Sequence, residues 1–239
     1  MDERHRKAVI RAVQEAGEHL GRGDKRNGVE KRSREIMLRR LREAEPVLSM
    51  WGEGGDERSF TICPLDSPIN LSRGIAPYGT MAALIEGGET VFGALYLPGE
   101  GLYTAEKGRG ARLDGRKVGG PAMTDSSRAL ICCDCSGYDQ DLQPISGAAV
   151  DALSRRARIW RNYGSPAAEY AWLATGRVDA VVVPFPESAH AAGYLLMEEA
   201  GATVTDGRGR PFSLGSGSLV AAGAALHEEL IGMLRRALP

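Results

Sequence analysis

Several signatures of common protein classes are missing from this sequence. The 239 residues contain no apolar run long enough to span a bilayer, and the charged start MDERHRKAVIRAV differs from a secretory signal. The formal net charge is only −1, so no overall field attracts nucleic acid or an anionic membrane. The chain also lacks internal repeats and low-complexity tracts. We therefore expect a cytoplasmic protein with no membrane or nucleic-acid partner.

Cysteine is scarce, and its placement excludes a disulfide framework of the secreted type. The four cysteines are Cys63, Cys132, Cys133 and Cys135. The last three include a C-x-x-C spacing, but no second pair follows at the distance of a zinc finger. Two interpretations of this cluster stay open: thiols at the end of a strand, or a redox or metal pair.

Length and composition are those of an ordinary globular protein, with 43% hydrophobic and 26% charged residues. A chain of this length can bury a substantial core as one large domain or two small ones. The pattern changes around Gly119-Gly120-Pro121. We therefore expect an N-terminal α+β half over residues 1–120 and a C-terminal α/β half over residues 121–239.

Hydrophobic periodicity predicts alternating helices and strands. In the first half we expect helices at 3–20 and 29–45 and strands at 60–63, 78–86 and 90–97, the last two joined by a Gly87-Gly88 hairpin turn. In the second half we expect strands at 129–133, 158–161, 181–183, near 203 and at 218–222, and helices at 145–156, 166–175, 190–200 and 225–237.

The stretch from Trp51 to Gly74 concentrates the chemistry. A buried strand ends at Pro64, and Asp66-Ser67-Pro68 has the pattern of a helix start. The free backbone N–H groups of Ser67, Ile69 and Asn70 are expected to bind phosphate, because a helix start presents unpaired donors. The carboxylates of Glu53 and Asp66 can hold a hard cation beside that phosphate.

These residues resemble the inositol monophosphatase family, within the superfamily of magnesium-dependent, lithium-sensitive phosphatases. The family motifs G-E-E and D-P-x-D-G-T-x-N-F correspond to Gly52-Glu53-Gly54 and to residues 63–71, CPLDSPINL. Residues 93–115, 164–180 and 191–201 also resemble family segments. The resemblance implies a layered α-β-α-β-α sandwich of the inositol monophosphatase and fructose-1,6-bisphosphatase type, a Mg²⁺-dependent phosphomonoesterase and a homodimer.

The chain departs from the family pattern where metal is bound. Cys63 replaces the first aspartate of D-P-x-D, Ala189 replaces the aspartate of W-D-x-A-A-G, and Pro68 replaces a threonine that orients water. The resemblance leaves Glu53, Asp66 and the Leu65 backbone carbonyl as metal ligands, with Glu53 and Asp66 as residual catalytic groups. It places phosphate at Ser67, Ile69, Asn70 and Ser165. Because Mg²⁺ requires hard oxygen ligands, any binding of it is expected to be weak.

Three hypotheses follow for function. The first is a phosphatase-fold protein whose hydrolysis is lost or much reduced and which binds a small phosphorylated metabolite or a partner. The second is a working phosphatase of inositol or sugar phosphates with a reduced metal site. The third is a soft-metal or thiol enzyme that uses Cys63 and His190 with Glu53 and Asp66, although zinc is not expected. Counted back from Glu53, Glu30 falls where the family has an aspartate, but a solvated glutamate in the first turn of a helix is the favoured interpretation. Glu187 lies beside Ala189.

Overall fold

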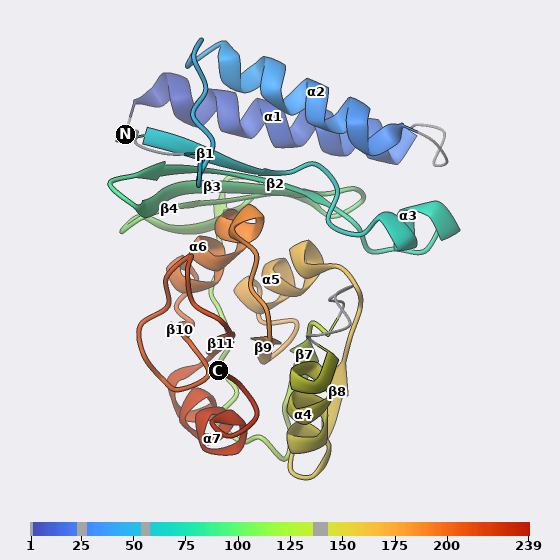
Figure 1. Cartoon of the computed structure of the whole chain (residues 1–239), viewed down its shortest axis with the longest axis vertical. Helices are drawn as coiled ribbons and strands as arrows, with labels where there is room; N and C mark the ends of the chain where they lie inside the picture. The colour runs from blue at the N-terminus through green and yellow to red at the C-terminus, as the bar shows by residue number, and fades with distance from the viewer. Residues whose placement is uncertain (1, 23–27, 54–57, 136–142) are drawn as a thin grey trace.

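The computed structural model describes residues 2–22, 28–53, 58–135 and 143–239. They form five stacked layers (Figure 1). Helices α1 (Glu3–Arg22) and α2 (Val29–Arg42) cover one sheet, and α5 (Pro166–Ala174) and α6 (Ala191–Glu199) lie between that sheet and a second one. The outer layer contains α4 (Gln143–Ser154) and α7 (Ala224–Leu234). This arrangement confirms the predicted α-β-α-β-α sandwich.

The first sheet is an antiparallel meander of six strands in chain order. Its strands are β1 (Arg58–Cys63), β2 (Thr80–Glu86), β3 (Glu89–Leu97), β4 (Gly101–Glu106), β5 (Gly110–Leu113) and β6 (Arg116–Lys117). The predicted hairpin is present, and Gly87 and Gly88 both have positive φ values, of 57° and 82°. Glycine adopts this conformation at little cost, so the short turn joins the two strands.

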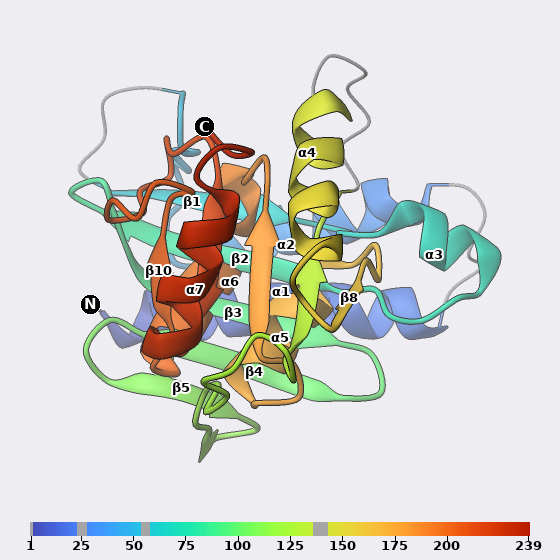
Figure 2. The same cartoon turned by 90° about the horizontal axis from the view of Figure 1, so that it is seen from below.

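The second sheet has the order β10-β11-β9-β7-β8. Its strands are β7 (Leu130–Cys133), β8 (Ile159–Arg161), β9 (Ala180–Val183), β10 (Thr203–Thr205) and β11 (Leu219–Ala222). Strand β7 runs parallel to both of its neighbours, whereas β11 is antiparallel to β9 and β10. These strands run across those of the first sheet, and α4 and α7 cover their outer face (Figure 2).

Side-chain alternation along the strands creates the three apolar layers. On β1, Ile62 packs beneath α1 and α2, while Cys63 faces the central layer. On β7, Cys132 faces the central layer and Cys133 faces α4 and α7. Two neighbouring cysteines therefore lie in different cores.

Close packing joins the second half of the chain to the first sheet. A Cβ atom on Gly93 of β3 would lie 2.7 Å from the Ala192 backbone of α6. A Cβ on Gly193 would lie 2.0 Å from the Tyr170 ring of α5. Both glycines allow an approach that any side chain would prevent, so α6 lies directly against β3.

Most predicted elements occur within a few residues of their expected bounds, but two helices end about a turn earlier than predicted. The helix expected to reach residue 237 ends at Leu234. The helix expected to reach residue 45 ends at Arg42, because the N–H groups of Ala44 and Glu45 both donate to the Leu41 carbonyl and turn the chain before Pro46. The short 3₁₀ helix η2 (Ser188–His190) begins earlier than the helix predicted there. Residues 23–27 of the predicted loop, and Gly54 of the G-E-E-like motif, lie outside the described residues.

The strands of the first sheet all precede residue 120, and those of the second sheet all follow it. The division into halves at 1–120 and 121–239 stays a prediction. Within the described ranges, no helix combines the length and apolar character needed to cross a bilayer.

Candidate functional site

The turn after β1 brings Asp66 to the start of α5. Its Oδ1 atom accepts a hydrogen bond of 2.6 Å from the Gly79 N–H. Its Oδ2 atom accepts one of 2.6 Å from the Ser165 hydroxyl and one of 3.0 Å from the Ala167 N–H. Because Ser165 and Ala167 belong to the start of α5, the carboxylate satisfies donors at that helix terminus from outside the helix.

Burial dominates the acid–base behaviour of Asp66. Desolvation raises the pKa of its carboxyl from 3.8 to about 6, although the bonds from Ser165, Gly79 and Ala167 favour the charged form. Asp66 therefore titrates near neutral pH.

Cys63, the last residue of β1, is buried behind Asp66. Burial raises the pKa of its thiol, and the negative charges of Asp66, Glu187 and Glu30 raise it further. The thiol therefore stays protonated at neutral pH, which makes it a poor nucleophile and metal ligand. Carboxylates from the turn, from the loop before η2 and from α2 thus act through their charge on a neutral group.

The element η2 occupies the other side of this centre and packs against β1. Ala189 lies there, partly buried against the same core as Cys63. His190 is buried, its Nδ1 is 3.4 Å from the Tyr170 hydroxyl, and desolvation lowers the pKa of its ring. The aromatic rings of Tyr170 and Tyr194 surround it. The imidazole is thus a neutral, packed side chain.

The residues predicted to bind phosphate are not equally accessible. Ser67 is only 3% exposed, and Ser165 is fully buried with its hydroxyl on Asp66. Asn70 donates from Nδ2 to the carbonyls of Pro77 and Tyr163. Ile69, at 54% exposure, lies open to solvent in α3 (Pro68–Arg73). Their role in binding phosphate stays a prediction.

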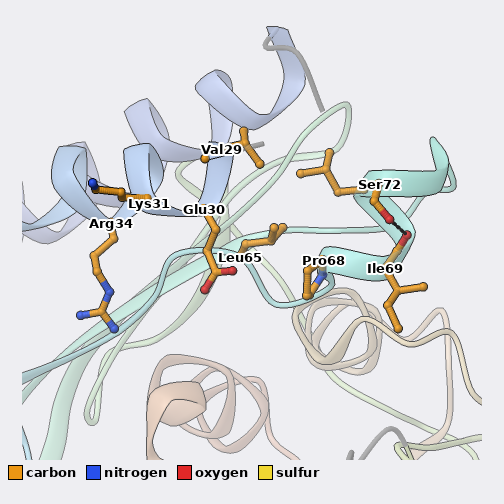
Figure 3. A pocket seen from close by; sticks show the side chains of 10 residues that line it. Val29, Glu30, Lys31, Arg34, Leu65, Pro68, Ile69 and Ser72 are labelled. Carbon is orange, nitrogen blue, oxygen red and sulfur yellow. Dashed lines mark hydrogen bonds between the residues drawn. The ribbon is translucent and has the colours of Figure 1, made fainter. Parts of the chain in front are cut away.

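A crevice of about 640 Å³ opens between α2 and α3, with Leu65 in its wall. Figure 3 shows Glu30 extending from α2 toward Leu65, with Arg34 one turn along the same helix and Pro68 across the opening. Sequence analysis considered Glu30 but missed Arg34. Their spacing of four residues, which places both side chains on one helix face, was the available signal.

Glu169 in α5 was also missed. It is fully buried, Oε1 accepts a 2.9 Å hydrogen bond from the Tyr163 N–H, and Oε2 has no partner among the described residues. Burial, with the nearby charges of Asp134 and Asp66, raises the pKa of this carboxyl well above its usual range. The signal in the sequence was an acidic residue in an otherwise apolar helix, PAAEYAWLA.

Comparison with known proteins identifies the fold and the family. A sequence model of the inositol monophosphatase family matches residues 26–238, nearly the whole chain. This chain belongs to the inositol monophosphatase family. One relative, the fructose-1,6-bisphosphatase/inositol-1-monophosphatase of Thermococcus kodakarensis, is 32% identical over 219 residues, which are 84% of this chain and 78% of the relative.

Two further matches extend the comparison within the inositol monophosphatase family. The Nus factor SuhB of Xylella fastidiosa is 31% identical over 195 residues, 79% of this chain and 71% of that protein. The solved structure of inositol monophosphatase from Anabaena (Nostoc) sp. superposes with a TM-score of 0.89 at 25% identity, covering 98% of this chain and 95% of the other.

The donor set of this family member does not fit the Mg²⁺ that the family motifs imply. Cys63 is a protonated thiol, Ala189 has no donor atom, and both oxygens of Asp66 already accept bonds. Glu53 is exposed after the turn that follows Met50. Across the described parts of the chain, no three His, Cys, Asp or Glu side chains lie close enough to share a metal ion. Hard octahedral coordination needs more oxygens than these positions offer.

Proposed function

We propose that this member of the inositol monophosphatase family has lost most or all metal-dependent phosphomonoesterase activity and acts by binding a small phosphorylated metabolite. One observation carries the proposal: Cys63 and Ala189 stand at family metal positions, while the carboxylate of Asp66 is bound to the start of α5. Without metal, the family mechanism lacks both the activated water and the charge that neutralises phosphate.

The crevice between α2 and α3 supports binding of such a ligand. Its volume of about 640 Å³ suits a small metabolite. Arg34 and Lys31 at its edge supply cationic donors for phosphate, and Glu30 can accept hydrogen bonds from sugar or inositol hydroxyls. Leu65 and Pro68 provide the apolar wall.

The direct test is phosphate release from inositol, fructose and nucleotide phosphates, with and without millimolar Mg²⁺. An active family phosphatase is assayed in parallel, and circular dichroism verifies that the chain is folded. We expect release at the level of the protein-free blank. Magnesium-dependent turnover close to that of the control enzyme would contradict loss of activity.

Ligand binding is tested separately by calorimetry with inositol monophosphate and with inorganic phosphate. Arg34→Ala should weaken binding by about tenfold or more, because a charge-assisted hydrogen bond contributes roughly 1.5–3 kcal/mol. The matched control is Arg32→Ala, on the same helix but paired with Glu35 at 3.0 Å. Equal effects of the two variants, or no binding by the folded wild type, would contradict the crevice as the site.

A second candidate is a phosphatase with a reduced metal site. The charges of Glu30, Glu187 and Asp66 all act on the Cys63 thiol, so carboxylates remain near the vacated positions. Under this alternative, Glu187→Gln lowers a measurable Mg²⁺-dependent activity.

Under either hypothesis, Cys63→Asp combined with Ala189→Asp should increase Mg²⁺ affinity. Calorimetry that detects no gain would overturn the alignment of these two positions with the family aspartates.

Association is the remaining functional question. A homodimer follows by analogy with the family, and light scattering on the purified chain tests it. One relative bears the name of a Nus factor, not of a phosphatase. This name supports partner binding as the function to pursue if no phosphorylated ligand binds.

A further inference from the structure

Two thiols touch at the carboxyl end of β7. The Sγ atoms of Cys133 and Cys135 are 3.2 Å apart, closer than unbonded sulfur atoms without a hydrogen bond normally approach. Residues two apart on an extended segment lie on the same side, with Cα atoms separated by roughly 6.6 Å. That separation is within the limit of about 6.8 Å for a disulfide.

The surroundings give the two thiols different roles. Cys133 is fully buried among the residues beneath α4 and α7, while Cys135 is partly exposed. The backbone between them is fixed, because the Asp134 N–H donates to the Val182 carbonyl at 2.9 Å. A hydrogen bond from Cys133 stabilises the thiolate of Cys135 and lowers its pKa, against burial and the charge of Asp134.

The other two cysteines have no such arrangement. Cys132 points into the opposite core, toward α5. Cys63 lies at the end of β1 in the first sheet, where burial, together with the charges of Asp66 and Glu187, raises the pKa of its thiol and keeps it protonated. In each case burial raises the thiol pKa. The chain therefore carries a paired, partly accessible dithiol and two buried single thiols that provide internal controls.

We propose that Cys133 and Cys135 form a reversible intrachain disulfide by exchange with a low-molecular-weight disulfide such as oxidised glutathione. The Cys135 thiolate attacks one sulfur of that disulfide, forms a mixed disulfide and releases one thiolate. The Cys133 thiol then attacks the Cys135 sulfur and loses its proton to solvent, and the second small thiol leaves. Two protein thiols are oxidised and one small disulfide is reduced to two thiols.

The test incubates the reduced full-length protein in glutathione buffers with an increasing ratio of oxidised to reduced glutathione. Acid then stops the exchange, and the free thiols are alkylated in denaturant. As the ratio rises, intact mass spectrometry should show the number of alkylated thiols falling from four to two, with no mass increase from glutathione attached to the protein. Peptide mapping should identify a disulfide between Cys133 and Cys135. Cys132→Ser should behave like the wild type. Cys135→Ser should retain its three remaining thiols at ratios that oxidise the wild type.

Cys133→Ala should stop the reaction at the first step and accumulate one glutathione on Cys135. Because Cys133 is buried, Cys133→Ser serves as a second variant, and circular dichroism verifies both folds. Four alkylatable thiols at every ratio in the folded wild type would overturn the proposal. Glutathione stably attached to wild-type Cys135, or disulfide-linked dimers on a non-reducing gel, would overturn it as well, because neither closes the intrachain bond.

Discussion

The ends of β1 and β7 carry similar residues in different environments. Strand β1 ends in Cys63 with Asp66 three residues later, and β7 ends in Cys133 with Asp134 and Cys135 following. At β1 the thiol is isolated and the Asp66 carboxylate is bound by three donors from other segments. At β7 the two thiols contact each other and one is partly exposed.

Neighbouring groups, more than residue type, decide the chemistry at a strand end. A carboxylate that accepts hydrogen bonds from a helix start and a loop joins these segments and has fewer free lone pairs for a metal. A buried thiol near negative charges stays neutral, while a thiol that receives a hydrogen bond from a second thiol becomes more reactive.

The largest expected effect comes from restoring the family residue at β1. Cys63→Asp should lower the free energy of unfolding by roughly 3 kcal/mol or more in metal-free buffer, since it adds a buried carboxyl beside Asp66 and Glu187. Urea unfolding measures the loss, with Cys63→Ser as the uncharged control. If Cys63→Asp lowers the free energy of unfolding no more than Cys63→Ser does, the surroundings of residue 63 still tolerate a charged carboxylate, as a metal site does.

The pH dependence of stability tests how Asp66 is held. The folded protein keeps the Asp66 proton up to about pH 6, whereas the unfolded chain releases it near 3.8. Stability from the neutral carboxyl is therefore fully present below about pH 4 and is lost as the pH rises through 6. Relative to Asp66→Asn, the wild type should lose about 2–3 kcal/mol between pH 4 and 7. If the stability of the wild type relative to Asp66→Asn instead increases with pH, the hydrogen bonds to Asp66 lower its pKa by more than burial raises it.

Removing one donor to Asp66 should have a smaller effect. Ser165→Ala deletes the 2.6 Å bond and should cost about 1.5–2 kcal/mol at pH 7, as expected for a buried hydrogen bond to a charged group. The matched control is Ser127→Ala, which deletes a 2.7 Å serine–aspartate bond at an exposed position and should cost less than about 0.5 kcal/mol. Similar losses in thermal unfolding would contradict the difference between the two environments.

The smallest effect is expected at β7. Cys135→Ser should change the unfolding free energy by less than about 0.5 kcal/mol, because Cys135 is partly exposed and serine has nearly the same shape. Denaturant unfolding under reducing conditions measures it. A loss above 2 kcal/mol would show that the thiol contact is a structural part of the core.

Local patterns were sufficient for most of the fold. Apolar spacing placed α1, Gly87-Gly88 located the β2–β3 turn, and Ser67-Pro68 marked the start of α3. These signals act within a few residues, so they are readable without tertiary contacts. The end of α2 was misplaced because it depends on the carbonyl to which the N–H groups of Ala44 and Glu45 donate.

Much less of the candidate site was predictable. The sequence identified Asp66 and Cys63 as important positions, but not that Asp66 accepts hydrogen bonds from Ser165, which lies 99 residues away. It also could not distinguish Cys132 from its neighbours, because opposite-facing side chains on a strand enter different cores only once the layers are stacked. The apolar helix around Glu169 marked it as unusual, but not that its Oε2 atom would have no hydrogen-bond partner among the described residues.

Periodicity, turn chemistry and residue type are enough to predict the order of elements, the family resemblance and the missing carboxylates at positions 63 and 189. Tertiary structure decided which groups meet: Asp66 with the start of α5, Glu30 and Arg34 with the wall of α3, and Cys133 with Cys135. Burial and hydrogen bonding depend on distances between segments remote in the chain, and those distances exist only after folding.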